Sequence, residues 1–163
     1  KDYMFYLSKN NMFYSIMFLM SNNIIKVSFY AKPLWIDDIL WDILNMSENK
    51  KAPISLRSVG AFTINSQIKI NEYNVENEKE INDIINSSFS DLLELSNIYD
   101  EDYYLKNYTN ISYQKEMIYT IVLIHNKEYE KALDFLYNTK LNDFVSDNKC
   151  FSDLAIEYIN KIQ

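Results

Sequence analysis

The chain of 163 residues contains little of what most enzymes and metal sites require. Its single glycine leaves no Gly-rich loop of the dinucleotide-binding or P-loop type, and no HExxH or GxSxG sequence is present. With one histidine and one cysteine, the chain lacks the side chains that most acid–base, nucleophilic and metal sites require. Cys150 alone cannot form an intrachain disulfide. These absences argue against an enzyme, a cofactor and a metal site, although carboxylate-only catalysis is not excluded by motif.

Basic residues are fewer than acidic ones. Sixteen Lys and Arg against 23 Asp and Glu give a net charge of −7, and no basic cluster exceeds Lys50 and Lys51. Nucleic-acid binding is disfavoured because phosphate contacts need a basic surface. An acidic surface instead suits a basic protein partner.

Long apolar runs are also missing. The most apolar segment, residues 12–20, is nine residues long, whereas a helix needs roughly 20 apolar residues to span a bilayer. We therefore expect no membrane insertion. A single cysteine fits the reducing cytoplasm, which is the expected location.

Apolar residues make up 48% of the chain, which is enough for a packed core. Residues 3–7, 12–20 and 24–31 are rich in aromatic and β-branched side chains, which predicts a three-stranded meander. Paired asparagines lie between these segments, and asparagine tolerates the positive φ of tight hairpin turns. The middle segment is apolar on both faces, so we expect it to be a central, covered strand.

Helical spacing of apolar residues predicts helices over 34–46 and 78–99. The stripe of the second helix comprises Ile81, Ile84, Ile85, Phe89, Leu92, Leu93 and Ser96. Residues 54–70 approach strand alternation, with Gly60 at a bulge or close backbone approach. Residues 71–80 predict an acidic loop that leads into the second helix.

Residues 99–110 predict a loop or short helix, and the remaining chain is helical. A hairpin runs over 113–136 with its turn at 125–127, and Ser152 is expected to cap a last helix. The fold class is therefore α+β: a mostly antiparallel sheet of four to five strands with packed helices, and a C-terminal helical hairpin plus helix. The expected division is an α+β domain at 1–98 and a helical annex at 111–163, packed on the same core.

The only arginine, Arg57, lies close to the only glycine. Its guanidinium could bind an anion. The favoured interpretation is a structural ion pair with Asp38 and Asp42 of the preceding helix, or with Asp37, because the planar fork suits a carboxylate. Asp38 and Asp42 lie one turn apart, but two carboxylates are too few for a cation site.

Two further groups of residues are candidates for a site. His125 and Cys150 could form a base and a nucleophile, but a turn histidine and a semi-buried cysteine are the simpler interpretation. Residues 97–108 mix rigid aromatic area with carboxylates, as protein-binding surfaces do. The candidate partner-binding residues are Tyr99, Asp100, Glu101, Asp102, Tyr103, Tyr104 and Tyr108. The alternative is a solvated loop whose tyrosines pack on the core. A second acidic stretch contains Glu72, Glu76, Glu78 and Glu80.

Residues 32–62, about a fifth of the chain, resemble a group of small uncharacterised bacterial proteins that look like the immunity proteins encoded beside contact-dependent or polymorphic toxins. The residues that carry the resemblance are Trp35, Asp37, Asp38, Trp41, Asn45, Asn49, Pro53, Ser55, Leu56, Arg57 and Gly60. The resemblance implies an α+β fold and a non-enzymatic binding role, and it transfers no catalytic residue.

We therefore expect a cytoplasmic, non-enzymatic protein-binding module, an immunity or antitoxin-like inhibitor of a basic protein partner such as a toxin. The alternative is a structural or regulatory adaptor that forms a homodimer or docks a peptide through its C-terminal helices. A third hypothesis places a small-ligand or enzymatic site around Arg57.

Overall fold

The computed structural model describes residues 2–59, 62–111, 114–142 and 149–163, which form two compact units. Unit 1 comprises Lys1–Pro33 and Asn65–Ser112, and unit 2 comprises Leu34–Ile64 and Tyr113–Gln163. This grouping differs from the division expected from the sequence, because residues 34–64 belong with the C-terminal helices and not with the sheet.

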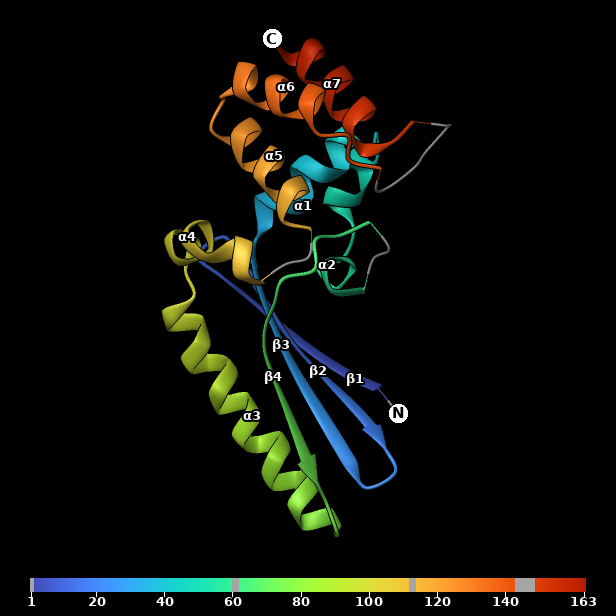
Figure 1. Cartoon of the computed structure of the whole chain (residues 1–163). Helices are drawn as coiled ribbons and strands as arrows, with labels where there is room; N and C mark the ends of the chain where they lie inside the picture. The colour runs from blue at the N-terminus through green and yellow to red at the C-terminus, as the bar shows by residue number, and fades with distance from the viewer. Residues whose placement is uncertain (1, 60–61, 112–113, 143–148) are drawn as a thin grey trace. The chain divides into compact units, whose positions relative to one another are not determined.

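Unit 1 contains a four-stranded antiparallel sheet in the order β1-β2-β3-β4 (Figure 1). Its strands are β1 (Asp2–Lys9), β2 (Met12–Ser21), β3 (Ile24–Pro33) and β4 (Gln67–Asn74). Asn10, Asn11 and Asn22 in the two hairpin turns have φ of 50°, 61° and 54°, the left-handed region where asparagine replaces glycine. The α+β class, the antiparallel sheet and the central position of β2 are therefore confirmed.

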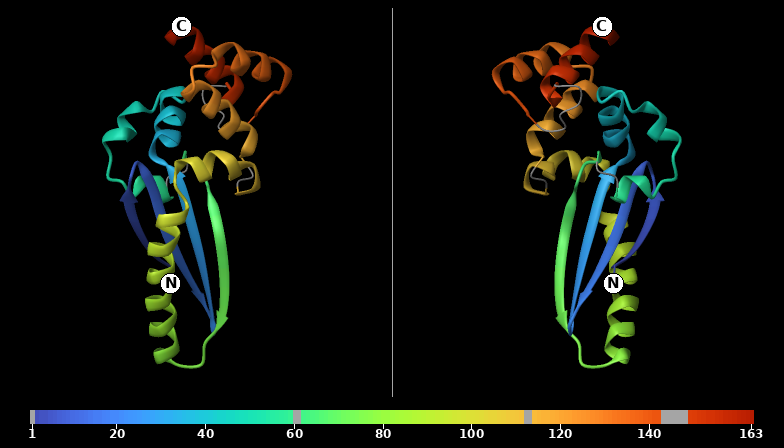
Figure 2. Two further views of the ribbon diagram at one scale, coloured as in Figure 1. Left: turned by 90° about the vertical axis from the view of Figure 1, so that its left-hand side faces the viewer. Right: turned by 90° about the vertical axis from the view of Figure 1, so that its right-hand side faces the viewer.

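Helix α3 (Glu78–Ile98) runs along one face of this sheet (Figure 2). The Phe89 ring lies 4.8 Å from Phe5 and 6.4 Å from Phe18, between ring centroids. We call this side of the sheet the helix face. The helix begins at the N-cap Asn77, whose side chain accepts from the backbone N–H of Glu80. Helix α4 (Glu101–Ile111) follows in the same unit.

Unit 2 is helical. It contains α1 (Leu34–Ile43), the 3₁₀ helix η1 (Ser47–Lys51), α2 (Leu56–Val59), α5 (Lys115–His125), α6 (Tyr129–Asn138) and α7 (Phe151–Ile162). Helices α5 and α6 form the expected hairpin, and α1 packs against α5 and α7. The fully buried side chains of Trp41, Ile118 and Phe151 show where these helices share a core.

The segment between α1 and α3 differs from the prediction. Residues 56–59 form the short helix α2 rather than a strand, and β4 extends to Asn74 through residues expected to be a loop. An edge strand pairs on one side only and tolerates polar, exposed residues, so β4 lacks the apolar alternation that marks a strand. Gly60 and Tyr113 lie outside the described residues.

The start of α7 also differs. Cys150 is the N-cap, and its backbone N–H and thiol both donate to the Asp153 carboxylate at 3.1 Å. The Ser152 hydroxyl instead accepts from the backbone N–H of Leu141 at 2.8 Å. Ser152 therefore ties the segment before α7 to the helix rather than capping it.

Candidate functional site

The acidic and aromatic segment 97–108 becomes the corner between α3 and α4. Asp100 is positioned by this corner: its Oδ1 accepts from the backbone N–H of Tyr103 at 2.8 Å. Glu101 and Asp102 follow in the first turn of α4, where negative charge is favoured by the helix dipole. The three carboxylates therefore also serve the local fold.

Two of the candidate tyrosines are core residues. Tyr104 is 1% exposed and Tyr108 is 9% exposed, and their rings stack at 6.4 Å between centroids. The Tyr104 hydroxyl and Ser66 Oγ share a hydrogen bond of 3.2 Å. Their spacing of four residues places both on the buried side of α4, so neither can bind a partner directly.

The remaining candidates stay accessible. Tyr99 and Tyr103 form a tilted ring pair at 4.4 Å, and Tyr103 is 36% exposed. We define the α4 acidic surface as Tyr99, Asp100, Glu101, Asp102 and Tyr103.

A buried tyrosine of the sheet holds this corner. The Tyr14 hydroxyl on β2 donates to the backbone carbonyl of Tyr99 at 2.7 Å. Burial, and next the charge of Asp100, raise the pKa of Tyr14. Burial, and next a hydrogen bond with Tyr103, raise the pKa of Tyr99. Both hydroxyls are therefore neutral at physiological pH, and Tyr14 fixes the backbone that presents the surface.

The second acidic stretch lies elsewhere. Glu72 belongs to β4, and Glu76, Glu78 and Glu80 lie before and in the first turn of α3. Helix α3 has 21 residues and is therefore about 30 Å long at 1.5 Å per residue. The two acidic stretches lie at opposite ends of this helix, so they do not form one surface.

Arg57 lies on α2 in unit 2, with its side chain 10% exposed. Its guanidinium donates to Asp38 Oδ1 at 2.6 Å and to the backbone carbonyl of Leu34 at 2.7 Å, and lies 4.7 Å from the Trp41 ring centroid. These contacts tie α2 to α1. They leave little of the guanidinium accessible to a ligand.

Asp37 extends the same cluster. Its carboxylate is fully buried, lies 3.6 Å from Arg57 and accepts from the backbone N–H of Ile64 at 2.9 Å. The Trp41 indole donates to the carbonyl of Phe62 at 2.7 Å. We call Arg57, Asp37, Asp38 and Trp41 the Arg57 cluster. It anchors both α2 and residues 62–64 to α1.

Asp42 is not part of that cluster. Its carboxylate accepts from Lys50 at 2.5 Å and from the Ser47 hydroxyl at 2.7 Å. Asp42 lies one helical turn after Asp38. The cation that it pairs with is Lys50 of η1, and not Arg57 as expected.

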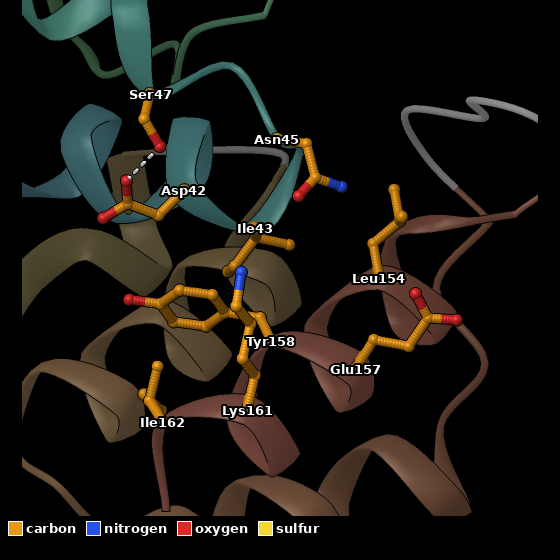
Figure 3. A pocket seen from close by; sticks show the side chains of 9 residues that line it. All are labelled: Asp42, Ile43, Asn45, Ser47, Leu154, Glu157, Tyr158, Lys161 and Ile162. Atoms are coloured by element: carbon orange, nitrogen blue, oxygen red, sulfur yellow. Dashed lines mark hydrogen bonds between the residues drawn. The ribbon is translucent and has the colours of Figure 1, made fainter.

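Asp42 lines a pocket of about 330 Å³ within unit 2, between the end of α1 and α7 (Figure 3). The pocket residues are Asp42, Ile43, Asn45, Ser47, Leu154, Glu157, Tyr158, Lys161 and Ile162. Burial, and next the charge of Asp42, raise the pKa of Tyr158. The pocket is lined by apolar side chains and by side chains of both charge signs.

His125 and Cys150 have separate structural contacts. The His125 imidazole stacks on Trp35 at 4.0 Å between centroids, and Cys150 caps α7. Over residues 2–59, 62–111, 114–142 and 149–163, no group of three or more His, Cys, Asp or Glu is placed to hold a metal ion. Among the same residues, none of the helices is long and apolar enough to cross a membrane.

Comparisons with protein families, curated proteins and solved structures find no match for this chain.

Sequence reasoning missed Tyr14 and the pocket on α7. Tyr14 lies in an apolar strand, where nothing local marks one aromatic as a hydrogen-bond donor. The pocket residues of α7 had a signal, because Leu154, Tyr158 and Ile162 recur every four residues along one side of the helix. This spacing predicts which side of α7 is apolar. It does not predict that the end of α1 lies opposite that side.

Proposed function

We propose that the chain is a cytoplasmic, non-enzymatic protein-binding module that inhibits a basic protein partner, in the manner of an immunity protein or antitoxin. The α4 acidic surface is the proposed contact region. The observation that carries this proposal is the run of three carboxylates beside the accessible Tyr99 and Tyr103 pair, at a corner fixed by Tyr14.

The physical argument rests on preorganisation and charge. Aromatic side chains held in place lose little entropy on binding. Carboxylates at the rim speed the encounter with a basic protein and make binding sensitive to salt. The scarcity of catalytic residue types and the net charge of −7 support binding over catalysis.

The first experiment is capture from the native host's lysate at low and high salt, with mass spectrometry of the eluate. A stoichiometric basic protein that salt releases is the expected result. An empty eluate at low salt contradicts the proposal.

The second experiment locates the contact. We expect the triple variant Asp100→Asn, Glu101→Gln, Asp102→Asn to weaken binding of the captured partner by about tenfold or more, because three rim charges are lost. Asparagine at position 100 keeps the helix cap, so the fold of α4 is retained.

A matched control removes the same number of charges elsewhere. The variant Glu72→Gln, Glu76→Gln, Glu78→Gln changes the net charge equally at the far end of α3. If both triple variants bind the partner with equal affinity, any loss of affinity relative to wild type comes from the change in net charge. The α4 acidic surface is then not the contact.

The pocket of Figure 3 favours a second candidate function, an adaptor that docks a peptide on its C-terminal helices. Lys161 would pair with an acidic group of the peptide, while Leu154 and Ile162 contact its apolar residues. Under this candidate, Lys161→Glu abolishes partner capture while the α4 triple variant leaves it intact.

A further inference from the structure

Strand β1 is an edge of the sheet without the usual protection. It pairs with β2 on one side, and no other strand of the described residues pairs with it. Its residues Tyr3 to Leu7 carry no charge. The opposite edge, β4, carries Lys69 and Glu72, and its register with β3 shifts between Phe29 and Tyr30. Charges and irregular register are what keep exposed edges from pairing.

The hairpin turn shows which backbone groups of β1 face outward. The turn has two residues, Asn10 and Asn11, so the flanking pair Lys9 and Met12 is hydrogen-bonded. Hydrogen-bonded and non-bonded pairs alternate along an antiparallel ladder. The amides and carbonyls of residues 4, 6 and 8 therefore point away from β2, toward the open edge.

A groove of about 490 Å³ lies beside this edge, between β1 and α3. Its lining is apolar and includes Leu7, Phe89 and Leu93. Leu93, expected on the buried stripe of α3, is 60% exposed, and Phe5 is 41% exposed. These apolar groups lie next to backbone that is ready to pair.

From Asn82 to Asn97, the side of α3 toward β1 is also uncharged. Asn97 accepts from Lys9 of β1, whereas Asp91 pairs with Lys69 of β4, which fixes how the helix is turned. Helical spacing places Asn82, Asn86 and Leu93 on the β1 side with Asn97. A segment that enters here meets no charge from the strand between Tyr3 and Leu7 or from this side of the helix between Asn82 and Asn97, and Lys79 lies beyond that stretch in the first turn.

We propose that β1 pairs antiparallel with β1 of a second copy, which joins the two sheets into one. This inference goes beyond the proposed function and does not depend on it. A two-fold axis normal to the sheet places residues of the same face opposite each other. Two registers are then possible. In the first, Phe5 faces the partner's Phe5, and in the second, Tyr6 faces the partner's Tyr6.

In the first register Leu7 faces the partner's Tyr3, and in the second it faces the partner's Phe5. Both are helix-face side chains. Either one fills the groove beside Leu93.

A second copy fits this edge because the edge complements itself. Pairing places no two like charges opposite each other between Tyr3 and Leu7 and satisfies the outward amides of both copies. At about 200 Å² for a whole aromatic side chain, the exposed parts of Tyr3, Phe5, Tyr6 and Leu93 amount to roughly 300–400 Å² per copy. A stable interface buries about 800 Å² per partner, so the dimer forms in the micromolar range or weaker.

The test is the mass of the full chain in solution by sedimentation equilibrium, from about 1 μM to about 1 mM. We expect the mass to rise from monomer to dimer across this range. A chain that stays monomeric throughout overturns the proposal, and any extended segment of another protein that pairs with β1 would then be the alternative occupant.

Two pairs of variants locate the contact. Tyr6→Lys and Ile70→Lys each place a lysine on an exposed edge position, 45% and 44% exposed respectively. Both positions lie on the face opposite α3, and both variants change the net charge equally. We expect Tyr6→Lys to remove the dimer and Ile70→Lys to keep it. The reverse result would move the contact to β4 and overturn the proposal.

Leu93→Gln and Ile98→Gln form the second pair, on opposite sides of α3. Leu93→Gln should weaken dimerisation about tenfold or more, because a polar amide then faces the partner's aromatic ring. Ile98→Gln should leave the dimer unchanged. Amide exchange of residues 4 and 6 should slow with rising concentration, and unchanged exchange in a dimer would place the contact elsewhere.

Discussion

Replacing Arg57 by lysine tests whether the Arg57 cluster holds unit 2 together. Lysine keeps the positive charge beside Asp37 and Asp38. Its single nitrogen cannot reach Asp38 and the Leu34 carbonyl in the fork geometry of the guanidinium, and it loses the flat contact with the Trp41 ring. The perturbation therefore removes geometry while preserving charge.

The expected cost follows from these contacts. One hydrogen bond to a charged group contributes about 1.5–3 kcal/mol, and a partly buried cation–π contact about 1 kcal/mol. The lysine ammonium recovers part of this lost stabilisation through its own contact with the carboxylates. Arg57→Lys should therefore destabilise unit 2 by about 2 kcal/mol. Arg57→Ala should cost about 3–5 kcal/mol, because the fully buried Asp37 loses the guanidinium beside it.

Both tryptophans, Trp35 and Trp41, lie on α1, so tryptophan fluorescence reports on unit 2. A loss of 2 kcal/mol should lower its melting temperature by roughly 8–16 °C. The control is Lys50→Ala, which breaks the exposed pair with Asp42 and should cost below about 1 kcal/mol. Equal melting temperatures for Arg57→Lys and wild type would refute the structural role and favour a ligand site at Arg57.

Three further predictions concern single contacts. Tyr14→Phe should cost about 1 kcal/mol in urea unfolding, since the carbonyl of Tyr99 loses its donor. Because the pKa of Tyr14 is raised in the fold, its contribution is present below about pH 10 and is lost as pH rises through the raised pKa, so the variant should flatten that alkaline loss of stability. Asn11→Val should cost about 1–2 kcal/mol at φ 61°, whereas Asn11→Gly should stay within about 0.5 kcal/mol of wild type. Hydrogen bonds from Cys150 lower the pKa of Asp153, so its contribution is present above about pH 4 and falls as pH drops through the lowered pKa. Asp153→Asn should remove that acid dependence in a titration of melting temperature.

The first three strands of the sheet were predictable because their signals are local. Asparagine pairs mark both hairpin turns, and the apolar run of β2 marks a strand covered on both faces. The C-terminal hairpin was predictable for the same reason, since helical spacing is unbroken on each side of His125. Where the residue pattern of an element and the residues of the adjacent turn indicate the same structure, a single sequence is enough to predict that element.

The failures come from contacts distant in sequence. Ile54–Val59 has strand-like residues, but Arg57 must reach Asp38 and Leu34 on α1, and the short helix α2 satisfies that contact. Tyr104 and Tyr108 carried a readable signal, because a spacing of four on a short helix indicates one buried side. The acidic residues between the tyrosines drew attention to the surface instead.

The order in which the chain visits its two units has a consequence for synthesis. Each unit is assembled from two separated stretches, with three passages between them near residues 33, 64 and 112. The first three strands leave the ribosome early, but α3, which covers their apolar face, emerges about 50 residues later. At about 5–20 residues per second, that face waits several seconds for its helix. Nascent chains should therefore need a chaperone during this interval, and neither unit can be produced as a single uninterrupted fragment.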